Sequence, residues 1–123
     1  MTHSAIICIG SNVHPRQKHI LEAAEKLAQT TTIHRQSSIS QTDDITGRGE
    51  PYLNMVIDIT TEASHKSLND IIIQIEQLCG RTPERSDRGI VDIDIDIVIW
   101  DGSIVKPDDF TRPFFYNLYK QIL

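Results

Sequence analysis

The chain has 123 residues, of which 39% are hydrophobic and 24% are charged, and its formal net charge is −5. This length predicts one domain, spanning residues 1–123, with its core between two packed layers, and the composition is that of a folded globular protein. The negative charge argues against a sequence-independent nucleic-acid binder, because such proteins need a basic surface.

Neither a membrane segment nor an export signal is expected. The longest apolar runs, such as residues 5–9 and 71–73, are far shorter than the ~20 residues that cross a bilayer. Residues 1–4 do not have the basic and apolar character of a signal peptide. We therefore expect a cytoplasmic protein, in which Cys8 and Cys79 are reduced core thiols rather than a disulfide.

The first third of the chain predicts a strand, a helix and a second strand. Residues 5–9 form a continuous apolar run, which the turn-forming residues 10–12 would end. Apolar residues recur at helical spacing over residues 15–30, where Pro15 suits the first turn. Residues 31–42 are rich in Thr, Ser and Ile, and this composition predicts a strand.

The middle of the chain predicts a surface loop, a strand and a helix. Residues 43–51 have the Gly, Pro and acidic residues of a loop. Residues 52–61 alternate between apolar and mostly polar residues, which indicates a strand with one buried face formed by Leu53, Met55, Ile57 and Ile59. Ser64 is a suitable cap for a helix that ends at Gly80.

The last part of the chain predicts a polar loop over residues 81–89 and a strand over residues 92–100, followed by a turn. The resulting order is βαββαβ. It indicates an α+β, ferredoxin-like fold in which two helices cover one face of an antiparallel sheet. The other face of the sheet would be open for a site.

An acidic stripe is the strongest functional feature of the last strand. Asp92, Asp94 and Asp96 would share one strand face, while the alternating isoleucines from Ile93 to Ile99 point to the other. Neighbouring carboxylates ~6.6 Å apart repel each other, and a divalent cation such as Mg²⁺ would relieve this repulsion. The alternative is an edge strand whose wet face happens to be acidic.

Arginines are concentrated just before this strand, in the loop that carries Arg81, Arg85 and Arg88 after the helix with Glu76. Guanidinium groups bind phosphate oxygens through paired hydrogen bonds, so the loop and the acidic strand together predict a site for nucleotide phosphates. A solvated surface loop is the alternative.

Other signals for a ligand are weaker. Tyr52 and Asn54 would share the polar face of their strand, where an aromatic ring and an amide could bind a heterocycle or form an ordinary polar surface. The five histidines have no metal-ligand spacing, and the glycines form neither a P-loop nor a dinucleotide-binding motif.

The motifs in chain order resemble the 6-hydroxymethyl-7,8-dihydropterin pyrophosphokinase family. The resemblance runs from Ile6 to about Pro113 and rests on Gly10-Ser11-Asn12, Thr42, Tyr52-Leu53-Asn54, Ile75-Glu76, Gly80-Arg81 and Asp94-Ile95-Asp96-Ile97. It implies a ferredoxin-like fold and a folate-biosynthesis enzyme that transfers pyrophosphate from ATP to the hydroxymethyl group of a reduced pterin, releasing AMP.

The resemblance also implies roles for individual residues. Asp94 and Asp96 would hold two Mg²⁺ ions and, with Arg81, form the catalytic group. Thr42 and Asn54 would border the pterin, and we place Tyr52 beside them. Around ATP the family pattern predicts Glu76, Arg81 and Thr111, to which the arginine loop adds Arg85 and Arg88.

ATP and the reduced pterin are therefore the expected partners, without nucleic acid or membrane, and the chain is expected to be a monomer or weak dimer. The loops after Thr42 and after Arg81 would close over the site.

Two positions depart from the family pattern. Val91 stands where the family has an arginine, and Phe114 stands where it has a histidine, while the family chain also extends further at its C-terminus. Arg85, Arg88 and Arg112 are candidate replacements for the lost phosphate contacts. These departures keep two alternatives open: a weak or inactive relative that binds nucleotide or pterin without turnover, and an interaction module without a ligand.

Overall fold

The computed structural model describes residues 1–42 and 49–123 and contains a six-stranded antiparallel sheet. The strand order is β2-β4-β1-β5-β6, and β3 pairs separately with β4. The strands are β1 His3–Ser11, β2 Thr32–Gln36, β3 Ser40–Thr42, β4 Tyr52–Thr61, β5 Asp94–Trp100 and β6 Ser103–Ile104.

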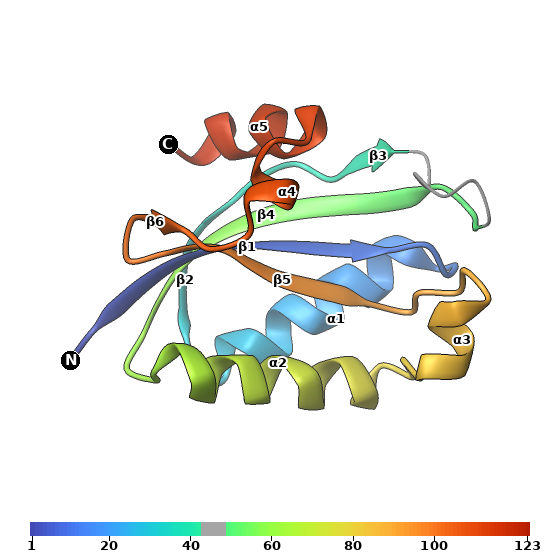
Figure 1. The fold of residues 1–123 in the computed structure, drawn as a ribbon, viewed down its shortest axis with the longest axis horizontal. Helices are drawn as coiled ribbons and strands as arrows, with labels where there is room; N and C mark the ends of the chain where they lie inside the picture. The colour runs from blue at the N-terminus through green and yellow to red at the C-terminus, as the bar shows by residue number, and fades with distance from the viewer. Residues whose placement is uncertain (43–48) are drawn as a thin grey trace.

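Helices lie on both sides of this sheet, and the two long ones share a side (Figure 1). The helices are α1 Arg16–Ala28, α2 His65–Leu78, α3 Pro83–Asp87, α4 Pro107–Phe110, α5 Pro113–Tyr119 and the 3₁₀ turn η1 Lys120–Ile122. The first strand lies between β4 and β5 at the centre of the sheet, so the predicted ferredoxin-like βαββαβ arrangement is confirmed. No helix of the described residues is long and apolar enough to span a bilayer.

The long helices form because their apolar residues recur on one stripe, which packs on the sheet. The stripe of α1 buries Ile20, Ala23, Ala24 and Leu27, and that of α2 buries Leu68, Ile72 and Ile75. Ser64 caps α2 as predicted, since its hydroxyl accepts a hydrogen bond from the Ser67 N–H. The main core lies between these helices and the sheet, with Ile7, Ile57 and Ile93 fully buried.

Three predicted element boundaries were wrong. Gly10 and Ser11 do not form a turn but continue β1, because they pair with Asn54 and Leu53 of β4. Residues 31–42 form two short strands rather than one. Pro15 is the N-cap residue that precedes α1, whereas it was expected within the first helical turn. Of the predicted loop 43–51, residues 43–48 lie outside the described part of the chain.

The second face of the sheet is not open throughout, contrary to the prediction. The helices α4 and α5 lie on this face (Figure 1), where Phe115 and Leu118 pack on Cys8, Val56 and Val98 in a second core cluster. The middle of β4 is therefore buried on both faces, since Val56 is covered as well as Ile57. Cys8 and Cys79 are free thiols, as predicted.

A β-bulge changes the side-chain alternation in β5. Ile6 of β1 pairs with Ile99, and the next residue, Ile7, pairs with Ile97. Val98 therefore has no partner residue in β1 and is the extra residue of the bulge. Ile99 consequently joins the second cluster instead of the main core, and its predicted place beside Ile97 was wrong. The carbonyl oxygen of Val98 accepts hydrogen bonds from the N–H groups of Val105 and Lys106. These bonds hold the chain that follows β6 against the bulge.

Candidate active site

A row of polar and small residues crosses the second face of the sheet beside the second core cluster. Asp94 of β5 pairs with Gly10 of β1, Gly10 pairs with Asn54 of β4, and Asn54 pairs with Ser40 of β3. Directly opposite residues of antiparallel strands project from the same face. The strand register therefore places the acidic residues of β5 and the polar end of β4 on one surface, with only β1 between them.

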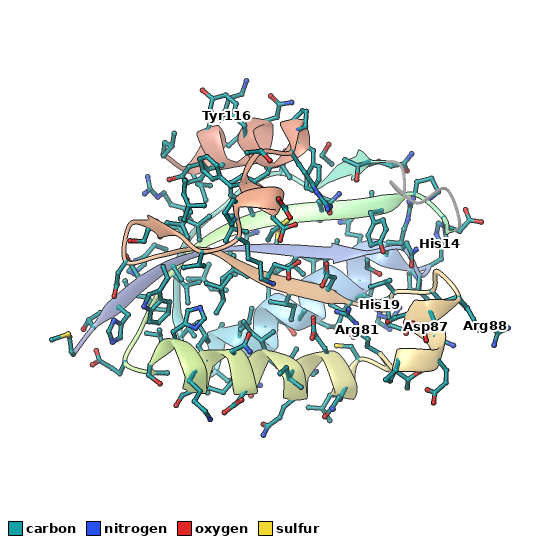
Figure 2. The ribbon with its side chains drawn as sticks, in the orientation of Figure 1. His14, His19, Arg81, Asp87, Arg88 and Tyr116 are labelled. Atoms are coloured by element: carbon teal, nitrogen blue, oxygen red, sulfur yellow. The ribbon has the colours of Figure 1, made fainter. Side chains whose placement is uncertain are left out.

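Arg81 joins the acidic residues at the open edge of β5. Its Nη1 lies 2.8 Å from Oε2 of Glu76 and 3.0 Å from Oδ1 of Asp94. The same Glu76 oxygen accepts the backbone N–H of Ile95 at 2.9 Å, so α2 is held against the strand edge. Figure 2 shows Arg81 between the end of α2 and β5. The fold thus brings together Glu76, Arg81 and Asp94, three of the residues singled out in the sequence.

The electrostatics of this group favour an additional cation. Burial, followed by the charge and hydrogen bond of Asp96, raises the pKa of Asp94 to about 7, although Arg81 opposes the shift. Burial also raises the pKa of Glu76, against the hydrogen bond from Ile95 and the charge of Arg81. The Asp94 side chain remains 39% exposed, so water screens part of the repulsion and leaves the carboxylate accessible to a ligand.

Asp96 has a cationic partner that the sequence did not suggest. Lys106, which caps α4, donates from Nζ to Oδ1 of Asp96 at 2.5 Å. Asp109 lies nearby in α4, where burial and the charge of Asp96 raise its pKa. No motif marks Lys106, because only the bulge and the turn through β6 bring it back onto β5.

The predicted pterin-binding residues lie together around Gly10. Nδ2 of Asn54 donates to Oγ1 of Thr42 at 2.8 Å, which joins β4 to β3. A Cβ atom on Gly10 would lie 2.9 Å from Oδ1 of Asn54 and 3.5 Å from the Tyr52 ring. The absence of a side chain at Gly10 therefore allows the amide and the ring to lie over β1.

Comparison of the sequence with known proteins decides the family. Residues 6–123 match the family described as 7,8-dihydro-6-hydroxymethylpterin-pyrophosphokinase, or HPPK. The chain belongs to the HPPK family. This membership confirms the predicted resemblance and with it the assignment to the pyrophosphokinases of folate biosynthesis.

Two curated relatives of this HPPK-family chain are both named 2-amino-4-hydroxy-6-hydroxymethyldihydropteridine pyrophosphokinase. The protein from Bacillus subtilis (strain 168) is 29% identical over 116 residues, which cover 92% of this chain and 69% of the relative. The protein from Haemophilus influenzae (strain ATCC 51907 / DSM 11121 / KW20 / Rd) is 28% identical over 115 residues, which cover 91% of this chain and 71% of the relative.

The acidic stripe contains two carboxylates rather than three. Asp92 precedes β5 and is buried. Its Oδ2 and Oδ1 atoms accept hydrogen bonds from Nε and Nη2 of Arg85 at 2.8 and 2.9 Å, respectively. The structure therefore separates Asp92 from Asp94 and Asp96. It also places Arg85 in an ion pair that holds the short helix α3, which replaces part of the predicted loop 81–89.

Arg88 and Thr111 are two further residues expected around ATP. Arg88 is exposed and points outward beyond α3 (Figure 2), beside a hollow of about 390 Å³ that Asn12, His14 and Glu50 help to line. The hydroxyl of Thr111 donates to the carbonyl of Asp108 at 3.3 Å. The arginine loop thus supplies one arginine, Arg81, in contact with Asp94 in this arrangement.

The donor set of the site suits Mg²⁺ in this HPPK-family chain. Within residues 1–42 and 49–123, no group of three or more His, Cys, Asp or Glu side chains is arranged to hold a metal. Mg²⁺ is commonly held by only one or two carboxylates together with water and phosphate oxygens. Asp94 and Asp96 supply two such carboxylates on one strand face, and their mutual repulsion favours a cation.

Proposed function

We propose that this chain transfers pyrophosphate from ATP to the hydroxymethyl group of 6-hydroxymethyl-7,8-dihydropterin and releases AMP. One observation supports this most directly. Asp94 of β5, in contact with Arg81, and Asn54 of β4 both face Gly10 of β1 in the register. A phosphate-binding group and a heterocycle-binding group on the same sheet face, with only the glycine of β1 between them, suit a transfer between two substrates.

Thr42, Tyr52 and Asn54 bind the pterin in this proposal. A pterin has a flat ring and an edge of N–H donors and carbonyl acceptors. The Thr42 hydroxyl accepts a hydrogen bond from the Asn54 side-chain amide, which fixes the orientation of that amide. The amide oxygen of Asn54 lies over Gly10. The ring of Tyr52 adds an aromatic surface beside it.

The chemistry requires positioning and charge neutralisation rather than a covalent nucleophile. The pterin hydroxyl attacks the β-phosphorus of ATP in line, and AMP leaves as the bond to the α-phosphate breaks. Two Mg²⁺ ions held by Asp94 and Asp96 would neutralise phosphate charge when bound. Arg81, whose guanidinium is oriented by Glu76, binds phosphate oxygens, and Glu76 keeps the guanidinium beside the strand edge.

A second group of residues supports the ATP side. Arg85 orients α3 through Asp92. Arg88 and Thr111 remain assigned to the nucleotide in this proposal on the family pattern and the arginine loop alone.

An assay for AMP tests the proposal. Purified protein with ATP, Mg²⁺ and 6-hydroxymethyl-7,8-dihydropterin should release AMP only when all three are present. Asp94→Asn removes one charge from the metal-binding pair and should lower kcat by about 10² or more. The control Asp70→Asn, which changes an exposed aspartate of α2, should retain the wild-type rate. Full activity in Asp94→Asn would refute the assigned role of Asp94.

A catalytically weak or inactive relative is the second candidate, favoured by two apolar replacements. Val91 is buried, and Phe114 packs against the second core cluster, so neither position offers a charged group to phosphate. This candidate predicts calorimetric binding of an ATP analogue or of the pterin without any AMP formed from ATP. Measurable turnover in the complete assay would exclude the inactive form of this alternative.

A further inference from the structure

Lys106 belongs to none of the roles assigned above, yet it contacts one of the two proposed metal-binding carboxylates. Its Nζ donates to Asp96, while Arg81 occupies Asp94 from the other end of the pair. Each of the two carboxylates thus contacts one side-chain cation, although Arg81 is shared between Asp94 and Glu76. A metal ion that binds Asp96 through Oδ1 therefore competes with the ammonium group of Lys106.

The backbone of Lys106 is held by hydrogen bonds, and its side chain is held by the ion pair with Asp96. Its N–H donates to the Val98 carbonyl at the bulge, and its own carbonyl accepts the N–H of Phe110 at the end of α4. The Lys106 side chain is 46% exposed, whereas that of Asp96 is 21% exposed. An ammonium group on a four-carbon stem can therefore leave Asp96 without any change in the fold.

The surrounding charges determine where the ammonium group goes. Asp96 is the direct partner of the Lys106 ammonium group, and Asp109 and Asp94 are further carboxylates close enough to act on its charge. A metal held by Asp94 and Asp96 would neutralise these two carboxylates, and the phosphate groups of a bound ATP would then be anions available to the ammonium group, together with Asp109 of α4. Lysine is a common phosphate ligand because its ammonium acts as a compact point charge.

We propose that Lys106 competes with the metal for Asp96 in the free protein and becomes a phosphate-binding cation once Mg²⁺ and ATP occupy the site. This inference rests on the proposed function. It assigns to Lys106 a positive charge that Arg85 cannot readily supply, because Arg85 is held by the buried Asp92.

Calorimetry on Lys106→Met tests the inference through two effects of opposite sign. Titration with Mg²⁺ alone should give about two- to fivefold tighter binding, since a competing ion pair on a half-exposed side chain has been removed. Titration with a non-hydrolysable ATP analogue in the presence of Mg²⁺ should give about tenfold weaker binding, since a charge-assisted phosphate contact is lost. Lys106→Arg, which keeps the positive charge, should restore both affinities toward wild type.

The matched control is Lys66→Met, which removes an exposed lysine whose Nζ lies 3.4 Å from Asp70 on α2. It should bind Mg²⁺ and the analogue as the wild type does. If Lys106→Met behaved like this control, or weakened the binding of Mg²⁺ alone, Lys106 would only anchor α4 and the inference would be wrong. Circular dichroism of each variant establishes that the comparison is made between folded proteins.

One further variant separates this inference from the proposed function. Asp94→Asn should lose Mg²⁺-dependent binding of the analogue regardless of what Lys106 does. If wild type binds the analogue, Asp94→Asn does not, and Lys106→Met is unchanged, the inference alone fails. If wild type itself shows no Mg²⁺-dependent binding, the proposed function fails and the inference fails with it.

Discussion

Gly10 shows how a single residue shapes the surface proposed to bind the pterin. It lies in the central strand, where an alanine would be compatible with the extended backbone. Its importance comes from space, because a Cβ atom there would lie 2.9 Å from Oδ1 of Asn54. The amide of Asn54 is buried and already bonded to Thr42, so it has little freedom to move aside.

Gly10→Ala should therefore displace Asn54 and weaken pterin binding about tenfold, while the affinity for an ATP analogue with Mg²⁺ changes little. Crowding of this kind costs about 1–3 kcal/mol of stability, which leaves a folded protein to measure. Calorimetric titration with 6-hydroxymethylpterin and, separately, with the analogue distinguishes the two effects. Asn54→Ala should reproduce the loss of pterin affinity. Wild-type pterin affinity in Gly10→Ala would show that Asn54 does not contact the pterin.

At the scale of elements, the short helix α3 depends on a few polar contacts, whereas α2 is held by its core packing. Five residues make up α3, and none of them is buried. The hydroxyl of Thr82 accepts the N–H of Arg85 at 3.2 Å, and Arg85 in turn binds Asp92. Because α3 directly follows Arg81, these contacts set the path of the chain beside the proposed phosphate site.

Thr82→Ala and Ser64→Ala form a matched pair of N-cap variants. Ser64→Ala should lower the free energy of unfolding by about 1 kcal/mol without changing the affinity for an ATP analogue, because α2 keeps its packed face. Thr82→Ala should lower the free energy of unfolding less than Ser64→Ala does. It should weaken the binding of the ATP analogue severalfold, because α3 would fray beside Arg81. Urea unfolding and calorimetry measure the two quantities. Equal effects of the two variants on affinity would contradict a local role for α3.

At the scale of the whole molecule, the C-terminal helices divide the second face of the sheet into two parts. One part is covered by α5 and η1, with Phe115, Leu118 and Ile122 buried. The other part carries the row from Asp94 across Gly10 to Asn54. Cys8 lies at the boundary, opposite Asp96 in the register, and burial, followed by the charge of Asp96, raises the pKa of its thiol. The second core cluster thus supports the site from the side.

Phe115→Ala should destabilise the protein by about 3–5 kcal/mol, because a fully buried aromatic side chain leaves a cavity between α5 and the sheet. Its neighbour Tyr116 is 58% exposed and points outward from α5 (Figure 2), so Tyr116→Ala should cost less than about 1 kcal/mol. Urea denaturation of both variants gives the comparison. Similar stability of the two would mean that α5 does not pack on the sheet as described.

The element order and the direction of most side chains could be predicted from local patterns in the chain. The spacing of apolar residues located β4 at residues 52–61 and the buried stripes of α1 and α2. An element with one buried face and one solvent-exposed face repeats apolar residues at a regular interval. The same regularity placed Asp94 and Asp96 on one strand face. The ordered motifs identified the family, and the association of Glu76 with Arg81 followed from their positions at one helix end.

Residues that join the site from distant parts of the chain could be identified only after folding. Lys106 reaches Asp96 because the bulge at Val98 and the turn through β6 fold the chain back, and neither leaves a local pattern. Asp92 looked identical to Asp94 in the sequence, but the strand begins after it and Arg85 binds it. Alternation describes a side chain only while the strand remains regular, whereas contacts across long sequence separations depend on how the chain turns.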